Sequence, residues 1–380
     1  MDTPPTSPAF TTSRYMPLSP ELEEGKCSQS SLDLLQSDLE LCSKNGNKVM
    51  DVMALYHGTL ASVACQVYGD RNVDLYLNPS LKIGKVRDRG SVSFIFDLED
   101  RYVIKCPMSR RKYDIILREA LILRLLQAPD NNIVPLIGVT YLGKSHFRHL
   151  RANELVPALV LQKFELNLHT YINLHQGDIQ PDKGVWHSLL RDILCALKFM
   201  KSKNIVHRDI KTSNILLNLP RHDTDTTRFY LADFTSADIE GPEEFNTTHD
   251  HVDTTLEYCA PELISFFSDM PMSNHSSHIV GTPSMHTDLY AAGLCLLSFI
   301  TGYEPYDQLF NSSSTNETRS RSASPVQKSQ WLINAISKMD PISLNIQDQR
   351  IYDIWREELQ ILNAILVERK PLEEIMQLLH

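Results

Sequence analysis

The stretch HRDIKTSN, residues 207–214, places three side chains of different chemistry within one short segment. Asp209 can accept a proton, Lys211 can neutralise phosphate charge, and Asn214 offers a hard oxygen ligand to a divalent cation. The apolar run at residues 215–217 follows directly. Three such groups so close together make this stretch the first candidate for a functional site.

Further motifs follow it in a fixed order. YLADF at residues 230–234 ends a strand-like segment, and TLEYCAPE occupies residues 255–262. Asp288 and Gly293 then lie in an apolar stretch with the character of a buried helix. One such match would be weak, but the ordered set resembles the signature motifs of eukaryotic protein kinases. The resemblance covers residues 81–380.

The resemblance implies a role for each polar residue of these motifs. Asp209 would act as the base that orients the attacking hydroxyl, and Lys211 would reach the transferring phosphate. Asn214 and Asp233 would bind Mg²⁺, which bridges the phosphates of ATP. Lys211 together with Thr255 is the pattern of serine/threonine kinases rather than tyrosine kinases.

Upstream residues complete the expected nucleotide site. Val-Ile-Lys at residues 103–105 resembles the strand that carries the ATP-binding lysine, and Glu119 would pair with Lys105 from the following helix. Lys105 would then hold the α- and β-phosphates. The backbone at the expected hinge would meet adenine, through Gln162, Lys163 and Phe164.

Two departures from the kinase pattern leave an alternative open. Residues 84–92 keep Gly84, Gly90 and Val92 to cover the phosphates, but they do not match the full pattern G-x-G-x-x-G-x-V. With fewer glycines, fewer backbone N–H groups would be free to bind the phosphates. Thr235 replaces the glycine of D-F-G, and a β-branched residue resists positive φ. No charged catalytic group is lost. We therefore expect an active kinase, with a pseudokinase scaffold that signals by binding as the alternative.

The chain is expected to form an α+β, two-lobed kinase fold. Short runs rich in β-branched residues predict strands at 92–96, 102–104, 133–139 and 159–161, with a helix at 113–126. From residue 186 the pattern is mainly helical. The small lobe would span residues 81–163 and the larger lobe residues 164–380. A disordered Pro/Ser/Thr-rich tail at 1–31 and a helical extension at 32–80 are expected before the kinase domain. Polar inserts near 267–284 and 311–324 are expected to interrupt it.

Composition excludes several other classes of protein. The formal net charge of −10 argues against a nucleic-acid binder. The N-terminal segment lacks the features of a signal peptide, and the apolar stretch at 289–303 is too short to span a bilayer. Seven scattered cysteines without a C-x-x-C pair indicate reduced thiols. We therefore expect a cytoplasmic or nuclear monomer with no membrane and no nucleic-acid partner.

The expected activation segment, residues 233–262, contains nine acids and no lysine or arginine. Arg208 lies beside Asp209, where kinases often hold a phosphorylated activation loop. Asp250, Asp253 or a phosphate on Thr247 or Thr248 would fill that place here; the alternative is that these acids form a solvated loop. The acids of this segment and of the N-terminal tail would favour substrates with basic residues near the target hydroxyl, or would let the tail dock on the body of the protein.

At the end of the same segment Glu262 needs a basic partner. Arg369 and Lys370 are the two candidates, because both lie just before Pro371, where kinases place an arginine for this purpose.

Several longer stretches are similar to one group of fungal serine/threonine kinases, including its D-F-T variant. They are KSHFR at 144–148, YLADFTSA at 230–237, EYCAPELI at 257–264, GLCLLSFI at 293–300 and SQWLINA at 329–335. The resemblance implies a kinase near protein kinase C and cell-wall signalling, with control of hexosamine supply as an output.

The N-terminal tail resembles a phosphorylation-dependent degron. Thr3-Pro4 and Ser7-Pro8 are proline-directed phosphorylation motifs, and two phosphates four residues apart can bind an Arg cluster. A proline-directed kinase would mark Thr3 and Ser7 for an F-box ubiquitin ligase.

Overall fold

The computed structural model describes residues 81–148, 150, 155–175, 181–220, 222, 226–239, 255–264, 283–308, 325–337 and 340–379. The expected tail at 1–31, the extension at 32–80, the insert at 311–324 and almost all of the insert at 267–284 lie outside these residues. The chain divides into two compact units. The described residues of the first unit fall within 81–124 and 136–163, and those of the second fall within 125–135 and 164–379.

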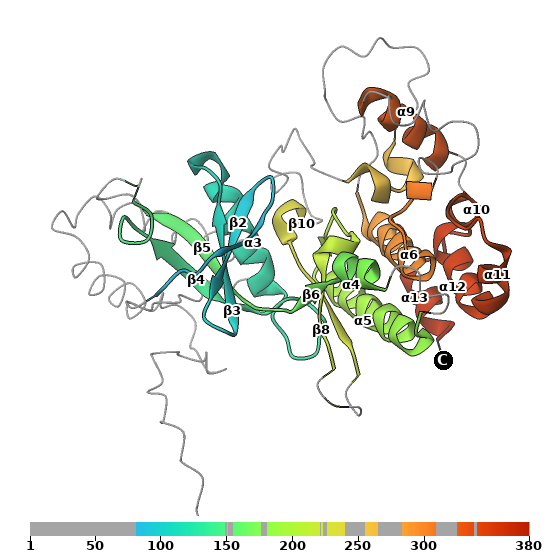
Figure 1. The fold of residues 1–380 in the computed structure, drawn as a ribbon, viewed down its shortest axis with the longest axis horizontal. Helices are drawn as coiled ribbons and strands as arrows, with labels where there is room; N and C mark the ends of the chain where they lie inside the picture. The colour runs from blue at the N-terminus through green and yellow to red at the C-terminus, as the bar shows by residue number, and fades with distance from the viewer. Residues whose placement is uncertain are drawn as a thin grey trace, which may run out of the picture. The chain divides into compact units, whose positions relative to one another are not determined.

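The first unit is built on a five-stranded antiparallel sheet in the order β1-β2-β3-β5-β4 (Figure 1). Its elements are β1 (Val86–Arg89), β2 (Ser93–Leu98), β3 (Tyr102–Pro107), the short helix η1 (Arg110–Lys112), helix α3 (Tyr113–Leu125), β4 (Leu136–Leu142) and β5 (Val156–Gln162). Side chains of β2, β3 and β5, among them Leu98, Ile104 and Val160, form a buried cluster with Tyr113 from α3. Burial of these apolar side chains fixes the register of the sheet.

One predicted strand begins later than its pattern indicates. The apolar run starts at Ile133, but β4 begins at Leu136. Pro135 lies between them and has no N–H to donate to a ladder, so the sheet cannot extend across it. Ile133 instead forms an isolated parallel bridge with Leu231, and both residues belong to the second unit.

The second unit is mainly helical and carries three short strand pairings. Its helices are α4 (Leu168–Leu174), α5 (Lys183–Ser202), α6 (Met285–Thr301), α9 (Pro325–Ile336), α10 (Pro341–Asn345), α11 (Gln349–Ile354), α12 (Arg356–Leu366) and α13 (Leu372–Gln377). Its strands are β6 (Leu166–Asn167), β7 (Ile205–Val206), β8 (Ile215–Asn218), β9 (Arg228–Leu231) and β10 (Asp238–Ile239). The short 3₁₀ helices are η2 (Thr212–Asn214), η3 (Phe234–Ser236), η5 (Leu256–Tyr258) and η6 (Pro261–Leu263). The two units together have the α+β character predicted from the sequence.

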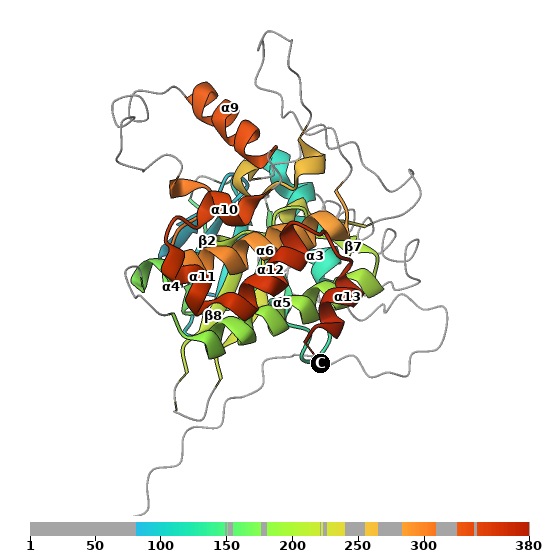
Figure 2. The same cartoon turned by 90° about the vertical axis from the view of Figure 1, so that its right-hand side faces the viewer.

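Helix α6 packs against both α5 and α12, and all three helices are seen in Figure 2. Every residue from Thr287 to Ile300 is buried, as expected for its apolar sequence. Ser284 and Thr287 form a reciprocal capping box at its start, and Gly302, with φ of 75°, ends it in the left-handed conformation. Among the described residues, no helix combines the length and apolar character needed to cross a bilayer.

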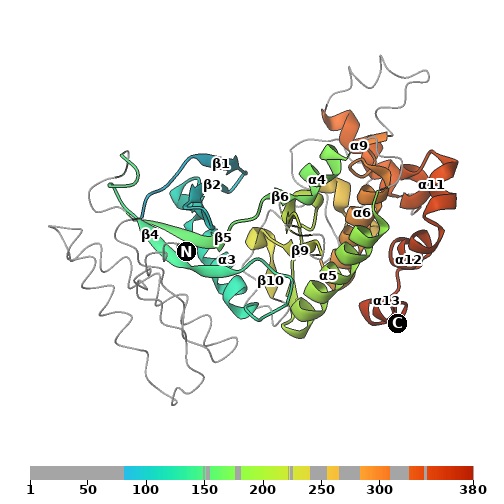
Figure 3. The ribbon, with the colours of Figure 1, turned by 60° about the horizontal axis from the view of Figure 1, so that its bottom comes forward.

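The strands β8 and β9 lie beside this helical core, with β9 against α5 (Figure 3). The loops at their ends carry the polar motifs. The segment between β7 and β8 contains residues 207–214, and the segment after β9 contains Asp233 and Thr235. The fold therefore places both sets of candidate residues on loops anchored by short, buried strands.

Candidate active site

The loop between β7 and β8 is held in place by Asp288. This residue lies near the start of α6, and its exposed fraction is 2%. The backbone N–H groups of His207 and Arg208 donate to its two carboxylate oxygens, at 2.6 and 2.9 Å. Arg208 has φ of 72°, a conformation that a non-glycine residue adopts at a cost. The two hydrogen bonds to a buried carboxylate hold it there.

His207 is fully buried and organises the same loop. Its Nδ1 accepts a hydrogen bond from the Asp209 backbone N–H at 3.3 Å, so Nε2 carries the proton and donates to the carbonyl of Ala232 at 3.0 Å. Burial lowers the pKa of His207, which keeps the imidazole neutral and preserves this pattern. The ring also lies 4.6 Å, centroid to centroid, from Phe234.

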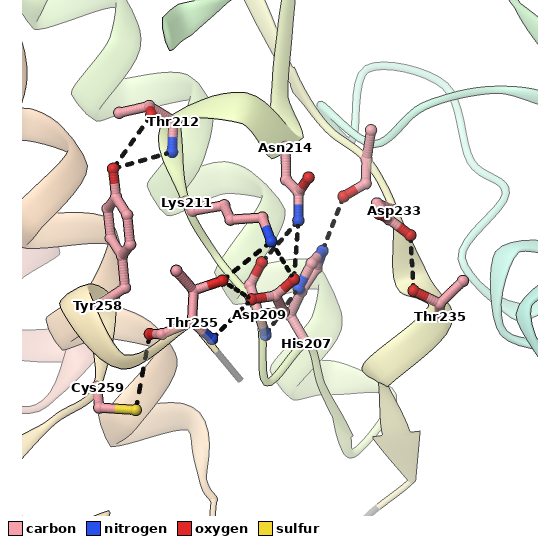
Figure 4. A network of polar contacts seen from close by, with 11 residues as sticks. His207, Asp209, Lys211, Thr212, Asn214, Asp233, Thr235, Thr255, Tyr258 and Cys259 are labelled. Atoms are coloured by element: carbon pink, nitrogen blue, oxygen red, sulfur yellow. Dashed lines mark hydrogen bonds and ion pairs between the residues drawn. The ribbon is translucent and has the colours of Figure 1, made fainter. Parts of the chain in front are cut away.

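Asp209 lies at the centre of a network of polar contacts (Figure 4). Lys211 Nζ donates to its Oδ2 at 2.8 Å, and the Thr255 hydroxyl donates to its Oδ1 at 2.9 Å. Lys211 also donates to the Thr255 hydroxyl at 3.0 Å. Asn214 Nδ2 donates to the Asp209 carbonyl at 2.8 Å. The structure therefore brings together four residues that the motifs place up to 46 positions apart.

Asp233 follows β9 with φ of 62°, and the Thr235 hydroxyl donates to its Oδ1 at 2.7 Å. Thr235 itself lies in the 3₁₀ helix η3 and is not among the described residues with positive φ. The strain expected of a β-branched residue at this position therefore does not arise. The left-handed residue is the aspartate, a type that tolerates this conformation.

The side chains of Asn214 and Asp233 suit a magnesium ion. Because Asn214 uses its amide nitrogen on Asp209, its Oδ1 is the atom oriented for a cation. In the described part of the chain, no group of three or more His, Cys, Asp or Glu side chains is arranged so that it could hold a metal ion by itself. One amide and one carboxylate fit Mg²⁺, which is usually held by few protein ligands and keeps waters and substrate phosphates for the remainder.

In the first unit, Lys105 of β3 and Glu119 of α3 form a buried ion pair. Lys105 Nζ lies 2.7 Å from Glu119 Oε1, and the two side chains are only 3% and 1% exposed. Charges so far from water persist only when they are paired. Glu119 thus fixes the position of the Lys105 ammonium group. A fixed ammonium group at this strand is what protein kinases use to bind the phosphates of ATP.

Comparison with known proteins yields one family. The protein kinase domain model matches residues 91–369. This chain belongs to the protein kinase family. It is similar to the serine/threonine-protein kinase ISR1 of Saccharomyces cerevisiae, 39% identical over 330 residues, which cover 81% of this chain and 71% of the relative. It is also similar to ISR1 of Eremothecium gossypii, 37% identical over 75% of this chain and 76% of the relative.

The hairpin of β1 and β2 occupies the place of the kinase glycine-rich loop. The sequence pattern predicts that Gly84 and Gly90 both cover phosphates, and the structure separates them. Gly84 lies at the base of the hairpin, where its N–H donates to the Asp97 carbonyl and an added Cβ would come within 2.9 Å of that oxygen. Gly90 opens the turn, its N–H donating to Ser93, and Val92 follows it there. Gly84 thus serves close backbone packing at the base of the hairpin, and its role in binding phosphate stays a prediction.

The expected hinge residues are held by contacts within their own units. Gln162 ends β5, paired with Tyr102 in the ladder. Lys163 donates its backbone N–H to the Arg101 carbonyl, and its Nζ lies 2.8 Å from Asp97, whose pKa this hydrogen bond lowers. The Lys163 N–H is therefore already used within the first unit, and the contact of this residue with adenine stays a prediction.

Phe164 begins the second unit after the hinge. Its ring is buried against Tyr230, 4.8 Å between centroids. The side chain therefore serves packing in the second unit, and a contact with adenine would have to come from its backbone.

Several site residues were not singled out by the sequence motifs. Glu304 lies in the turn after α6 and accepts hydrogen bonds from the hydroxyls of Thr212 and Tyr258. Asp238 of β10 pairs with Arg208. No local pattern marks either acid, because their partners lie 30 or more positions away in the chain.

The structure shows which of the two basic residues proposed from the sequence pairs with Glu262. Glu262 pairs with Arg369, whereas Lys370 lies 3.0 Å from Glu368. The guanidinium of Arg369 also lies over the ring of Tyr290. The end of the expected activation segment is therefore tied to the helical core through Arg369.

Proposed function

We propose that this kinase transfers the γ-phosphoryl group of ATP to serine and threonine hydroxyls of proteins. The single observation that carries this proposal is the Asp209 carboxylate held on both oxygens by Lys211 and Thr255. A carboxylate fixed in this way can orient a substrate hydroxyl and accept its proton during transfer. Lys211 adds positive charge beside it, which would stabilise the transferring phosphoryl group.

Other residues of the chain would bind and position the nucleotide. Lys105, held by Glu119, would contact the α- and β-phosphates. Asn214 and Asp233 would hold Mg²⁺, which when bound neutralises phosphate charge. The presence of Thr255 within the catalytic network supports serine and threonine rather than tyrosine as the acceptor.

Transfer of radiolabelled phosphate from ATP to a protein substrate tests this function. Wild-type protein should transfer label, and Asp209→Ala should lower the rate by about 10²- to 10⁴-fold, the usual contribution of a general base. Lys105→Arg keeps the positive charge but changes its geometry and should also lower transfer. Transfer that survives both substitutions would come from a contaminating kinase.

A pseudokinase scaffold is the second candidate, and one observation favours it. Gly84 lies outside the turn of the β1–β2 hairpin, which leaves Gly90 as the glycine in that turn. A hairpin with few glycines exposes fewer N–H groups to phosphates. Absence of transfer by wild-type protein that still binds nucleotide would support the scaffold.

We further propose a place for this kinase in fungal protein kinase C and cell-wall signalling, with hexosamine supply as an output. The support is the overall similarity to relatives named ISR1. Comparison of the phosphoproteomes of wild-type and Asp209→Ala cells tests it. Loss of phosphorylation on proteins of cell-wall or hexosamine metabolism is expected; unchanged phosphorylation of those proteins would contradict the proposal.

The tail is proposed to control the lifetime of the protein. Thr3 and Ser7 lie outside the described residues, so the support is their Thr-Pro and Ser-Pro sequence alone. A proline-directed kinase would phosphorylate them for an F-box ubiquitin ligase. Replacing both by alanine should lengthen the half-life after synthesis is blocked, and an unchanged half-life would contradict the proposal.

We also propose that the kinase acts as a monomer in the cytoplasm or nucleus. The scattered cysteines without a C-x-x-C pair support a reducing compartment. Light scattering of the purified chain and imaging of a fluorescent fusion protein test the two parts. A dimer mass, or fluorescence confined to a secretory organelle, would contradict them.

A further inference from the structure

The guanidinium of Arg208 is paired with a carboxylate from the beginning of the activation segment. Arg208 Nη1 donates to Asp238 Oδ2 at 3.0 Å. The two side chains are 14% and 18% exposed, so solvent screens the pair only partly. Asp238 lies five residues after the metal-binding candidate Asp233, on the strand β10.

The backbone around this pair fixes its position. β10 runs antiparallel to β7, and Asp238 lies opposite Val206, two residues before Arg208. Arg208 is held in its left-handed conformation by the bond from its N–H to Asp288, and Asp209 is the next residue. A change in the position of the Arg208 side chain would therefore shift the backbone of the adjacent residue, Asp209.

In many kinases this arginine is engaged by a phosphate, and the new ion pairs order the activation loop. Here a carboxylate of the segment already pairs with it. The segment from 233 to 262 also contains no lysine or arginine that could add a second positive charge for a phosphate, which carries a charge of about −1.5 to −2. A phosphate arriving near Arg208 would also be repelled by Asp238.

We propose that Asp238 is a positioning residue that holds Arg208 and the catalytic loop in place of a phosphate. The kinase is then active without phosphorylation of its activation segment. This inference rests on the proposed phosphotransfer function and concerns the regulation of that same site.

The test uses the full chain after phosphatase treatment, in a Thr247→Ala, Thr248→Ala background, with the unphosphorylated state checked by mass spectrometry. This protein should keep the kcat of untreated wild type within about twofold. Asp238→Asn in the same background should lower kcat by about 10- to 100-fold, which corresponds to the loss of one hydrogen bond between charged groups. The KM for ATP should change little, and Asp238→Glu should restore much of kcat.

A matched control and a double variant separate positioning from general stability. Asp348→Asn removes another aspartate that pairs with an arginine, Arg350, on the exposed start of α11, and should leave kcat unchanged. Introducing Asp238→Asn into an Arg208→Ala protein should cause little further loss, because Asp238 acts through Arg208.

The outcomes are distinct. Full activity of the Asp238→Asn protein would overturn the inference. So would an equal fall in kcat when Asp238→Asn is introduced into proteins with and without Arg208. Activity that is lost on phosphatase treatment and recovered on rephosphorylation would also overturn it. If neither wild type nor Asp348→Asn transfers phosphate in any state, the proposed function itself fails.

Discussion

Thr235 replaces a glycine of the kinase signature, and its hydroxyl contacts the carboxylate proposed to bind magnesium. The Thr235 hydroxyl donates to Oδ1 of Asp233 at 2.7 Å. Hydrogen bonds of this kind fix the orientation of a metal-binding carboxylate and tune its affinity for the ion. At this position the sequence departs from the kinase signature, and the threonine adds a donor that glycine lacks.

Replacing Thr235 by valine should therefore weaken magnesium binding. Valine keeps the shape but removes the donor, and the loss of such a contact typically lowers metal affinity by about 10- to 100-fold. Thr235→Ser keeps the hydroxyl and serves as the control. The measurement is the Mg²⁺ concentration at half-maximal binding of an ATP analogue, followed by calorimetry; equal midpoints for the valine and serine variants would contradict it.

His207 should make the stability of the fold depend on pH. Its pKa is lowered by burial from 6.5, so the unfolded chain takes up a proton at a pH where the folded protein does not. Because the unfolded state then binds more protons, the free energy of unfolding falls as pH drops below about 6.5, the ordinary pKa of histidine. Urea denaturation between pH 7 and pH 5 measures this slope.

Two variants test whether His207 causes that slope. His207→Gln should reduce it, even though the variant is less stable at neutral pH. His175→Gln replaces an exposed histidine at the end of α4 and should leave the slope unchanged. A slope that is the same in all three proteins would mean that other groups are responsible.

At the scale of elements, the hydrophobic pattern of the sequence correctly predicts the helices and strands that bury one continuous face. The helix predicted at 113–126 is found as α3, Tyr113–Leu125. The predicted strand at 102–104 lies within β3, Tyr102–Pro107. Hydrophobic periodicity predicts such elements because the same side chains that set the period also form the core. The error at Ile133 has an equally local cause, the missing N–H of Pro135.

Gly293 lets α6 and α12 approach closely, because it has no Cβ. A Cβ built on it would come within 2.8 Å of side-chain atoms of Ile365 and Leu366. Gly293→Ala should therefore lower the free energy of unfolding by about 1–2 kcal/mol, because the overlap costs about 1–3 kcal/mol and the gain in helix propensity offsets up to about 1 kcal/mol. Chemical denaturation measures the difference.

Gly90→Ala is the matched control for that substitution. A Cβ on Gly90 would meet only the Ser93 carbonyl oxygen at 3.7 Å, an ordinary contact. We expect a change in unfolding free energy of less than about 0.5 kcal/mol. A Gly293→Ala protein as stable as the control would show that α12 shifts without cost.

At the scale of the whole molecule, charge is distributed unevenly along the chain. The formal net charge is −10, yet residues 233–262 alone carry nine acids and no lysine or arginine, and residues 1–40 carry seven acids against two bases. Residues 240–254 lie outside the described structure, so this pattern is an argument from sequence. It remains a prediction that the kinase prefers basic residues near the acceptor hydroxyl.

A peptide library tests this preference. Peptides with lysine or arginine near the target serine should have higher kcat/KM than their alanine counterparts, and the advantage should shrink between about 50 mM and 500 mM salt as the charges are screened. Deletion of residues 1–40 separates the tail from the segment, because the preference should survive if the segment causes it. A preference for acidic peptides would contradict the prediction.

The sequence by itself determined the family, the catalytic motif at 207–214 and most of the elements, because these depend on residues that are close in the chain. Only the tertiary structure decided which long-range partner each charged group takes. Pairing of β10 with β7 brings Asp238 to Arg208 although the segment offers several other acids, and packing against α6 selects Arg369 over Lys370 for Glu262. Such choices depend on strand register and helix packing, which sequence spacing does not encode.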